Sequence, residues 1–186
     1  MQLRIWAAIA GAALAWGTNG VATRAALNDG VPPIALVAIR AVLATALLYL
    51  LLRLRGRRAP SDVATWRTGL VQGVFQLSAP FVLFTLAYEN ASAGFVGLLV
   101  ALIPIATAVI AHFMLPDEPL HTAKVVGLVV AFSGVAFLLL SGDSGLEEGG
   151  RPLVAAVLSI ASVGSISFAG VYAKGRADQF DPMELT

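Results

Sequence analysis

A charged side chain inside an apolar run is the first feature of this sequence that could do chemistry. Arg40 lies within the run Val31–Leu52, which holds no other charged residue. A charge at the centre of a membrane helix costs about 2.5–3.5 kcal/mol on insertion scales, so it usually faces a cavity or a partner. We therefore expect Arg40 to contact a substrate or to act in gating. The alternative is a structural role, in which its guanidinium bonds neighbouring carbonyls or reaches toward the membrane surface.

An aromatic and an amide side chain share one face of the first apolar run. Trp16, Asn19 and Thr23 recur at i, i+3 and i+7, which is the spacing of one helical face. This pairing suits a small polar or zwitterionic solute, because cavities combine apolar walls with a few convergent polar groups. The alternative is that Trp16 only packs the bundle.

A second polar face lies on the third run. Gly69, Gly73, Gln76 and Pro80 recur at i, i+4, i+7 and i+11, with Gln72 beside them. The glycines are interpreted as sites of close helix packing. The amides of Gln72 and Gln76 can donate and accept hydrogen bonds, so they are candidates to line a substrate cavity, with plain helix packing as the alternative.

Two prolines and one acid complete the candidates. Pro80 and Pro104 each remove a backbone hydrogen bond and predict a kink. Carbonyls freed at Pro104 could line a path, although a static bend is the commoner outcome. Glu118 lies in the polar segment Pro116–His121, where it could pair with a basic residue as a gate or remain solvated. No apolar run contains a carboxylate, so a proton relay through a membrane-buried acid has no candidate.

Catalysis, metals and cofactors find little support. The chain has no cysteine, and its two histidines, His112 and His121, lack the HxxxH or HExxH spacing of metal sites. We therefore expect no enzyme activity, no metal and no cofactor. The net charge of +1 argues against a nucleic-acid partner.

The composition says which elements must carry these residues. Of 186 residues, 58 % are hydrophobic and 12 % charged, against about 25 % charged in soluble domains. A membrane helix needs about 20 apolar residues. The runs are continuous rather than alternating, which favours helices over barrel strands. We predict an all-α polytopic membrane bundle with six transmembrane helices, over Ile5–Thr23, Val31–Leu52, Thr68–Tyr88, Asn90–Leu115, Val125–Gly142 and Pro152–Ala173.

The basic residues predict the orientation of this bundle. Lys and Arg are enriched in short cytoplasmic loops. With the N-terminus inside, nine basic residues lie on the inner side, namely Arg4, Arg53, Arg55, Arg57, Arg58, Arg67, Lys124, Lys174 and Arg176. Two, Arg24 and Arg151, lie on the outer side. We expect a multi-pass protein of the cytoplasmic membrane with a cytoplasmic N-terminus. The basic cluster of Arg53, Arg55, Arg57 and Arg58 is expected to meet anionic lipid headgroups.

A faint internal repeat suggests two copies of one unit. Residues 6–9 (WAAI) resemble residues 154–157 (VAAV), and Pro33 and Leu36 find counterparts in Pro182 and Leu185. A five-helix repeat has an odd number of helices, so its second copy enters the membrane inverted. Transporters with such inverted repeats bind their substrates near the membrane midplane between the two halves.

Four local patterns follow one another along the chain. They are AWGTN at 15–19, AIRA at 38–41, the hairpin and proline-bearing segment LAYENASAGFVGLLVALIPIATAVIAHFML, and LPDEPLHTAKVVGLVVAFSGVAFLLL after it. Together they resemble the drug/metabolite transporter superfamily, in particular its EamA-like branch. The resemblance implies a first five-helix repeat over 1–142. It also implies a linker and the first helix of a truncated second repeat over 143–186. Members commonly have ten helices, so the chain resembles the first half of an inverted-repeat transporter.

The expected function follows from this resemblance. It implies secondary transport, with export favoured, of small metabolites or drugs by alternating access. The alternative is a non-transporting membrane scaffold or assembly subunit. Expected partners are a small-molecule substrate and membrane lipid, together with either a second copy in a homodimer or the missing C-terminal half.

Overall fold

The computed structural model describes residues 2–56, 63–140 and 151–176, and these ranges are built from helices and short connections. The elements are α1 (Gln2–Asn28), α2 (Pro33–Leu54), α3 (Val63–Gln72), the π-helical segment η1 (Gly73–Ser78), α4 (Ala79–Asn90), α5 (Ala93–Val100), α6 (Ile103–Met114), α7 (Thr122–Leu140) and α8 (Pro152–Lys174). Because α3, η1 and α4 form one continuous rod, and α5 and α6 a broken one, the described helices follow the six predicted segments.

The predicted polytopic, all-helical membrane bundle is confirmed. Five segments are long and apolar enough to cross a membrane, namely Ile5–Asn28, Pro33–Leu54, Val63–Asn90, Ala93–Met114 and Pro152–Lys174. Thr122–Gly134, within α7, is a shorter apolar helix. Many large apolar side chains point outward, including Leu14, Ile34 and Leu153, which are 70 %, 74 % and 77 % exposed. Lipid is the solvent in which such a surface is stable.

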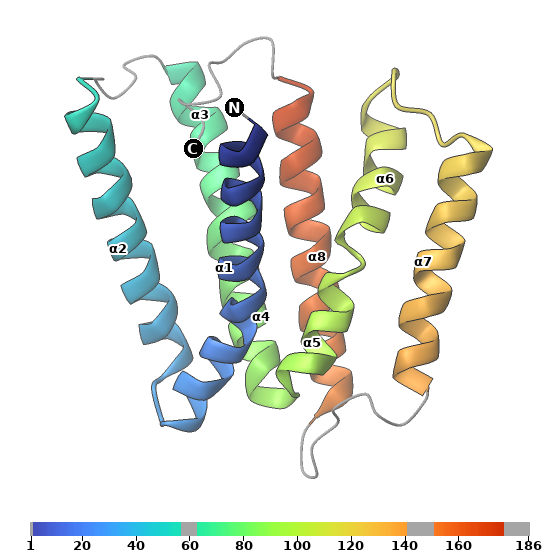
Figure 1. Ribbon diagram of the computed structural model, residues 1–186, viewed down its shortest axis with the longest axis horizontal. Coiled ribbons are helices and arrows are strands. Elements are labelled where there is room, and N and C mark those ends of the chain that lie inside the picture. Colours follow the sequence, from blue (N-terminus) through green and yellow to red (C-terminus); the bar gives the residue numbers. More distant parts are fainter. Residues whose placement is uncertain (1, 57–62, 141–150, 177–186) are drawn as a thin grey trace.

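The connections alternate between two ends of the bundle (Figure 1). The start of α1, the connection from α6 to α7 and the end of α8 lie at one end. The α1–α2 and α4–α5 connections lie at the other. The α1–α2 connection turns at residues 29 and 30, where Gly30 takes a φ of +85°, which suits glycine. The expected linker within 143–150 and the repeat positions Pro182 and Leu185 lie outside the described residues.

Two charged residues lie inside helices where the sequence predicted connections. Arg24 belongs to α1, which continues to Asn28, and its Nη1 donates to the backbone carbonyl of Tyr88. Arg67 belongs to α3, which begins at Val63. A charge near a helix end can reach the membrane surface or a backbone acceptor, so charge alone did not mark the helix limits.

The third rod contains a π-helical turn that the sequence did not predict. The backbone N–H of Ala79 donates to the carbonyl of Val74, five residues earlier. Pro80 follows directly, and a proline cannot donate to the carbonyl four residues before it. The wider turn thus absorbs the disruption at Pro80. Such turns are rare and are frequent at functional sites.

The fourth rod breaks at the turn of Ala101 and Leu102, just before Pro104. The helix after the break, α6, begins at Ile103, so Pro104 lies in its first turn. A proline is tolerated there because the N–H it lacks would have no helical partner. The kink expected at Pro104 is therefore present as a short interruption between α5 and α6.

α8 packs against both irregular rods through hydroxyl groups. Ser162 Oγ donates to the carbonyl of Pro80 at 3.0 Å, and Ser167 Oγ lies 3.3 Å from the carbonyl of Ile103. Thr107 Oγ1 and Ser167 Oγ are 3.1 Å apart. These contacts satisfy carbonyls near the breaks. Toward the α4–α5 end, α8 closes a core of buried residues, namely Ala87, Tyr88, Ala91, Phe95, Val96, Leu99 and Ala155.

Candidate functional site

A cavity of about 340 Å³ lies among α1, α2, the η1–α4 rod and the α5–α6 rod, with one contribution from α8. Its polar lining includes Trp16, Asn19, Thr23, Arg40, Gln76, Thr85 and Tyr88. Its apolar lining includes Val21, Phe81, Phe84, Val100, Ile103 and Ile166. Six residues singled out from the sequence thus meet at one cavity, although they come from three different rods, namely Trp16, Asn19, Thr23, Arg40, Gln76 and Pro80.

Arg40 reaches this cavity from α2 and is held by α1. Its Nη2 donates to Thr23 Oγ1 at 2.9 Å, and the Thr23 hydroxyl in turn donates to the carbonyl of Asn19 at 2.7 Å. Thr23 is 1 % exposed, so the acceptor for the guanidinium is fixed in position. A guanidinium has five N–H donors, and this chain of bonds orients the fork while leaving donors for a further partner.

Gln76 reaches the cavity from the π-helical segment. Its Oε1 is buried and makes no hydrogen bond within the described part of the chain. A buried amide oxygen without a donor costs about 1–3 kcal/mol. Because Gln76 also lines the cavity, a solute with an N–H or O–H group could remove that cost.

Tyr88 is a lining residue that sequence reasoning missed. Its hydroxyl fits against α1 because position 20 is glycine, where an added Cβ would lie 2.7 Å from Tyr88 Oη. The signal was available, since Gly20 follows Trp16 by four residues and therefore shares its helical face. Tyr88 itself stands at the end of its apolar run, where nothing in the sequence distinguished it from an interfacial tyrosine.

Three of the singled-out residues lie away from the cavity lining. Gln72 is 8 % exposed and donates through Nε2 to the carbonyl of Ala169 at 2.8 Å, so it joins α3 to α8. Pro104 lies in the first turn of α6. Glu118 lies in the connection between α6 and α7, at the end of the bundle where α8 finishes.

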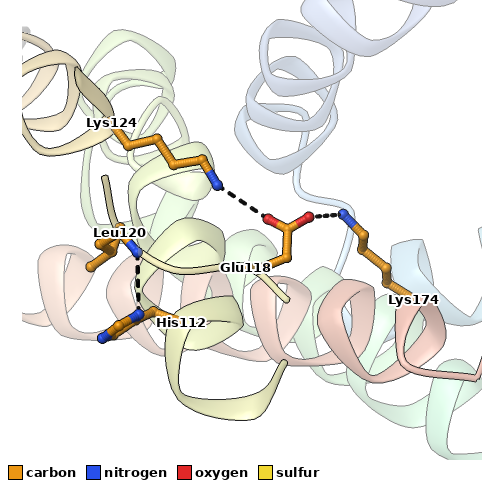
Figure 2. Close-up of polar contacts among 5 residues, drawn as sticks. All are labelled: His112, Glu118, Leu120, Lys124 and Lys174. Atoms are coloured by element: carbon orange, nitrogen blue, oxygen red, sulfur yellow. Dashed lines mark hydrogen bonds and ion pairs between the residues drawn. The ribbon is translucent and has the colours of Figure 1, made fainter. Parts of the chain in front are cut away.

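Glu118 joins two helices at that end (Figure 2). Its carboxylate pairs with Lys124 Nζ of α7 at 3.3 Å and with Lys174 Nζ of α8. The hydrogen bond from Lys174, then that from Lys124, lowers the pKa of Glu118 below its ordinary value. The same connection is held by His112, whose Nδ1 accepts from the backbone N–H of Leu120 at 3.2 Å. The α6–α7 connection is therefore tied to α8.

The charge of the cavity is one-sided. Arg40 brings a permanent positive charge, and no acidic residue occurs among the described residues that line the cavity. Within the described ranges there is also no group of three metal-ligating side chains. The lining can therefore offer cationic N–H donors, an amide acceptor and aromatic surface to a ligand.

The comparisons with known proteins identify relatives of this chain. The model of the EamA-like transporter family matches residues 4–140. The uncharacterized transporter YvbV of Bacillus subtilis is 27 % identical over 168 residues, which are 89 % of this chain and 52 % of that protein. An uncharacterized protein of Pseudomonas aeruginosa is 31 % identical over 144 residues, which are 77 % and 48 % of the respective chains. The chain thus spans about half the length of these relatives. No solved structure matches it significantly.

Proposed function

Because this chain belongs to the EamA-like transporter family, we propose that it binds a small metabolite in the cavity at Arg40 and carries it across the cytoplasmic membrane by alternating access. Membrane transport is the activity of the family to which the chain belongs. The observation that carries the finer proposal is that Trp16, Asn19, Arg40 and Gln76 meet at one cavity of about 340 Å³. A charge is rarely kept among apolar helices without a ligand or partner.

The organisation proposed for the chain is a first repeat over 1–142 followed by a linker and the first helix of a second repeat. The family match over residues 4–140 supports the first part. α8 begins beyond that match and packs on α4 and α6 through Ser162 and Ser167. In an inverted-repeat transporter the substrate lies between the halves. Ile166 of α8 lines the cavity, as expected if α8 opens the second half.

The direction proposed is export, with the N-terminus in the cytoplasm. The direction rests on the family resemblance, and the orientation on the excess of basic residues at one end. At that end, the pairing of Glu118 with Lys124 and Lys174 is proposed as a gate between the first repeat and α8. Gln72 and Pro104, which lie away from the cavity lining, are proposed to shape the packing of the rods around α8.

The test uses the complete protein in liposomes loaded with a mixture of small cellular metabolites. Mass spectrometry of the external solution should find selected solutes released faster than from protein-free liposomes. Release should fall when Trp16, Asn19 or Arg40 is replaced and persist when the outward-facing Leu14 is replaced by Val. Equal release from protein-free liposomes for every solute would contradict transport by this protein.

A further inference from the structure

The sign of charge in the cavity points to a class of solute. We infer that the cavity selects a small organic acid with a single negative charge, an apolar body and one hydrogen-bond donor, and that it rejects organic cations. This inference rests on the proposed function only in taking the cavity as a solute site. The two polar groups of the solute are assigned to two residues. Arg40 would bind the acid group, and Gln76 would accept a hydrogen bond from the donor of the solute.

The acid group is assigned to Arg40. The bond from Nη2 to Thr23 at 2.9 Å fixes one arm of the guanidinium. The remaining donors match a carboxylate, because a guanidinium presents its N–H groups as a planar fork. No acidic residue among the described lining residues competes for that fork. A cation placed there would instead meet the Arg40 charge with no carboxylate to balance it.

The single charge follows from the lining as well. Arg40 is the one charged residue among the described residues that line the cavity. A dianion such as a phosphate monoester would keep one charge uncompensated among apolar side chains, which is costly in a medium of low dielectric constant. A carboxylate would be neutralised by the guanidinium alone.

The donor is assigned to Gln76. Its Oε1 is buried and without a donor in the described part of the chain. A hydroxyl or amine on the solute would satisfy this oxygen. Phe81, Phe84 and Ile103 also line the cavity and offer apolar surface to the body of the solute.

Binding to the purified complete protein in nanodiscs tests this inference without requiring transport. Isothermal titration calorimetry would compare 3-phenyllactate with its methyl ester, with 3-phenylpropanoate, with phenyl phosphate and with 2-phenylethylamine. We expect phenyllactate to bind most tightly. Its ester should lose the Arg40 contact, phenylpropanoate the Gln76 contact, and the amine should not bind.

The variants assign the contacts to residues. Arg40→Gln should weaken phenyllactate binding about 10- to 100-fold, the loss expected for a charge-assisted hydrogen bond, while leaving the ester unaffected. Arg40→Lys, which keeps the charge but loses the fork, should bind with intermediate affinity. Arg53→Gln is the matched control, because Arg53 lies on the same helix but packs on the Tyr49 ring at its end, away from the cavity lining.

Several results would overturn the inference. They are equal binding of the acid and its ester, tighter binding of the amine or of phenyl phosphate, and unchanged acid binding in Arg40→Gln. An absence of binding by every acid, with Arg40→Gln unfolding at lower temperature, would mean that another group of the protein occupies the guanidinium. Acids that bind but do not cross liposomes would uphold the site and contradict the proposed transport.

Discussion

Ser165 Oγ on α8 lies 2.8 Å from the backbone carbonyl oxygen of Phe75, inside the π-helical segment η1. A π-helical turn displaces the normal i→i−4 bonds, so its carbonyls are available to partners outside the helix. Ser162, one turn earlier on α8, donates to the carbonyl of Pro80 just beyond the segment. α8 therefore contacts the third rod on either side of Gln76, at Phe75 within the segment and at Pro80 beyond it, and so stabilises the position of Gln76.

The hydrogen bonds between α8 and the third rod predict unequal effects for two buried serines of α8. Ser162→Ala removes the donor to the Pro80 carbonyl and should lower the free energy of unfolding by about 0.6–1.7 kcal/mol, which runs from the average to the largest value measured for hydrogen bonds between membrane helices. Ser159 is also 0 % exposed, but its Oγ has no hydrogen-bond partner among the described residues. Ser159→Ala should therefore be neutral or stabilising, because it removes an unsatisfied hydroxyl.

Unfolding of the complete protein by sodium dodecyl sulfate, followed by circular dichroism, would measure both variants. The two serines lie on the same helix and lose the same atom, so differences in helix propensity cancel. An equal loss of stability in both variants would contradict the conclusion that the hydrogen bond of Ser162 stabilises the packing of α8 on the third rod.

The rods of the fold could be predicted from the sequence because lipid imposes a simple rule. Each spanning segment must be helical and apolar over about 20 residues, whatever its neighbours are. The details that escaped prediction depend on neighbours. In the π-helical segment before Pro80, the carbonyl of Phe75 accepts a hydrogen bond from Ser165, which lies 90 positions further along the chain. No local pattern reports such a partner.

The sequence predicted those parts of the candidate site that can be recognised within a single helix. Trp16 and Asn19 share a face, and Arg40 stands out by its charge, so these residues could be singled out one helix at a time. Gln72 and Gln76 were equally good candidates in the sequence, but Gln76 lies within the π-helical segment, whereas Gln72 ends the α-helix before it. Gln76 consequently lines the cavity, whereas Gln72 bonds the carbonyl of Ala169 on α8.

Acid should loosen the contact of Glu118 with α8. The partners lower the pKa of the Glu118 carboxylate from its ordinary value of 4.5. The stability that its ion pairs contribute is therefore present at a pH above 4.5 and is lost as the pH falls through the lowered pKa. Spin labels on cysteines introduced at Asp117 and Arg176 would report the separation of the α6–α7 connection from the end of α8. We expect a narrow distance distribution at pH 7 that broadens as the pH falls below the ordinary carboxyl range.

Two variants separate this effect from general unfolding. Glu118→Gln should give the broad distribution at pH 7 and remove its dependence on pH, whereas Glu89→Gln in α4 should behave as the wild type. Because the pairs are solvent-exposed, raising the salt concentration should broaden the wild-type distribution as well. A narrow distribution in Glu118→Gln would show that the Glu118 pairs do not set the distance between the connection and the end of α8.

The proposed orientation predicts which end of the bundle is accessible from outside the cell. The chain has no cysteine, so single cysteines can be introduced without background. Asp29→Cys, in the α1–α2 connection, should react with an impermeant thiol reagent on intact cells. Asp117→Cys, at the opposite end, should react only after the membrane is opened. The reverse pattern would invert the topology and place Glu118 on the outer side.

A single methyl group on α1 should test how closely α1 and Tyr88 must approach for the cavity to keep its shape. A Cβ at Gly20 would lie 2.7 Å from Tyr88 Oη and 3.2 Å from its Cζ, whereas a Cβ at Gly17 would meet nothing within 4 Å. Both glycines line the cavity, so Gly17→Ala is the matched control.

Gly20→Ala should displace the tyrosine and cost about 1–3 kcal/mol, as overpacking usually does, with a corresponding loss of solute flux in liposomes. Tyr88→Phe removes the atom at 2.7 Å, so the double variant Gly20→Ala/Tyr88→Phe should recover part of the lost stability. Thermal unfolding of the four proteins gives the coupling energy between the two positions. If the two losses simply add, the cost of Gly20→Ala does not come from the Tyr88 hydroxyl, and the close approach of α1 to that hydroxyl does not shape the cavity.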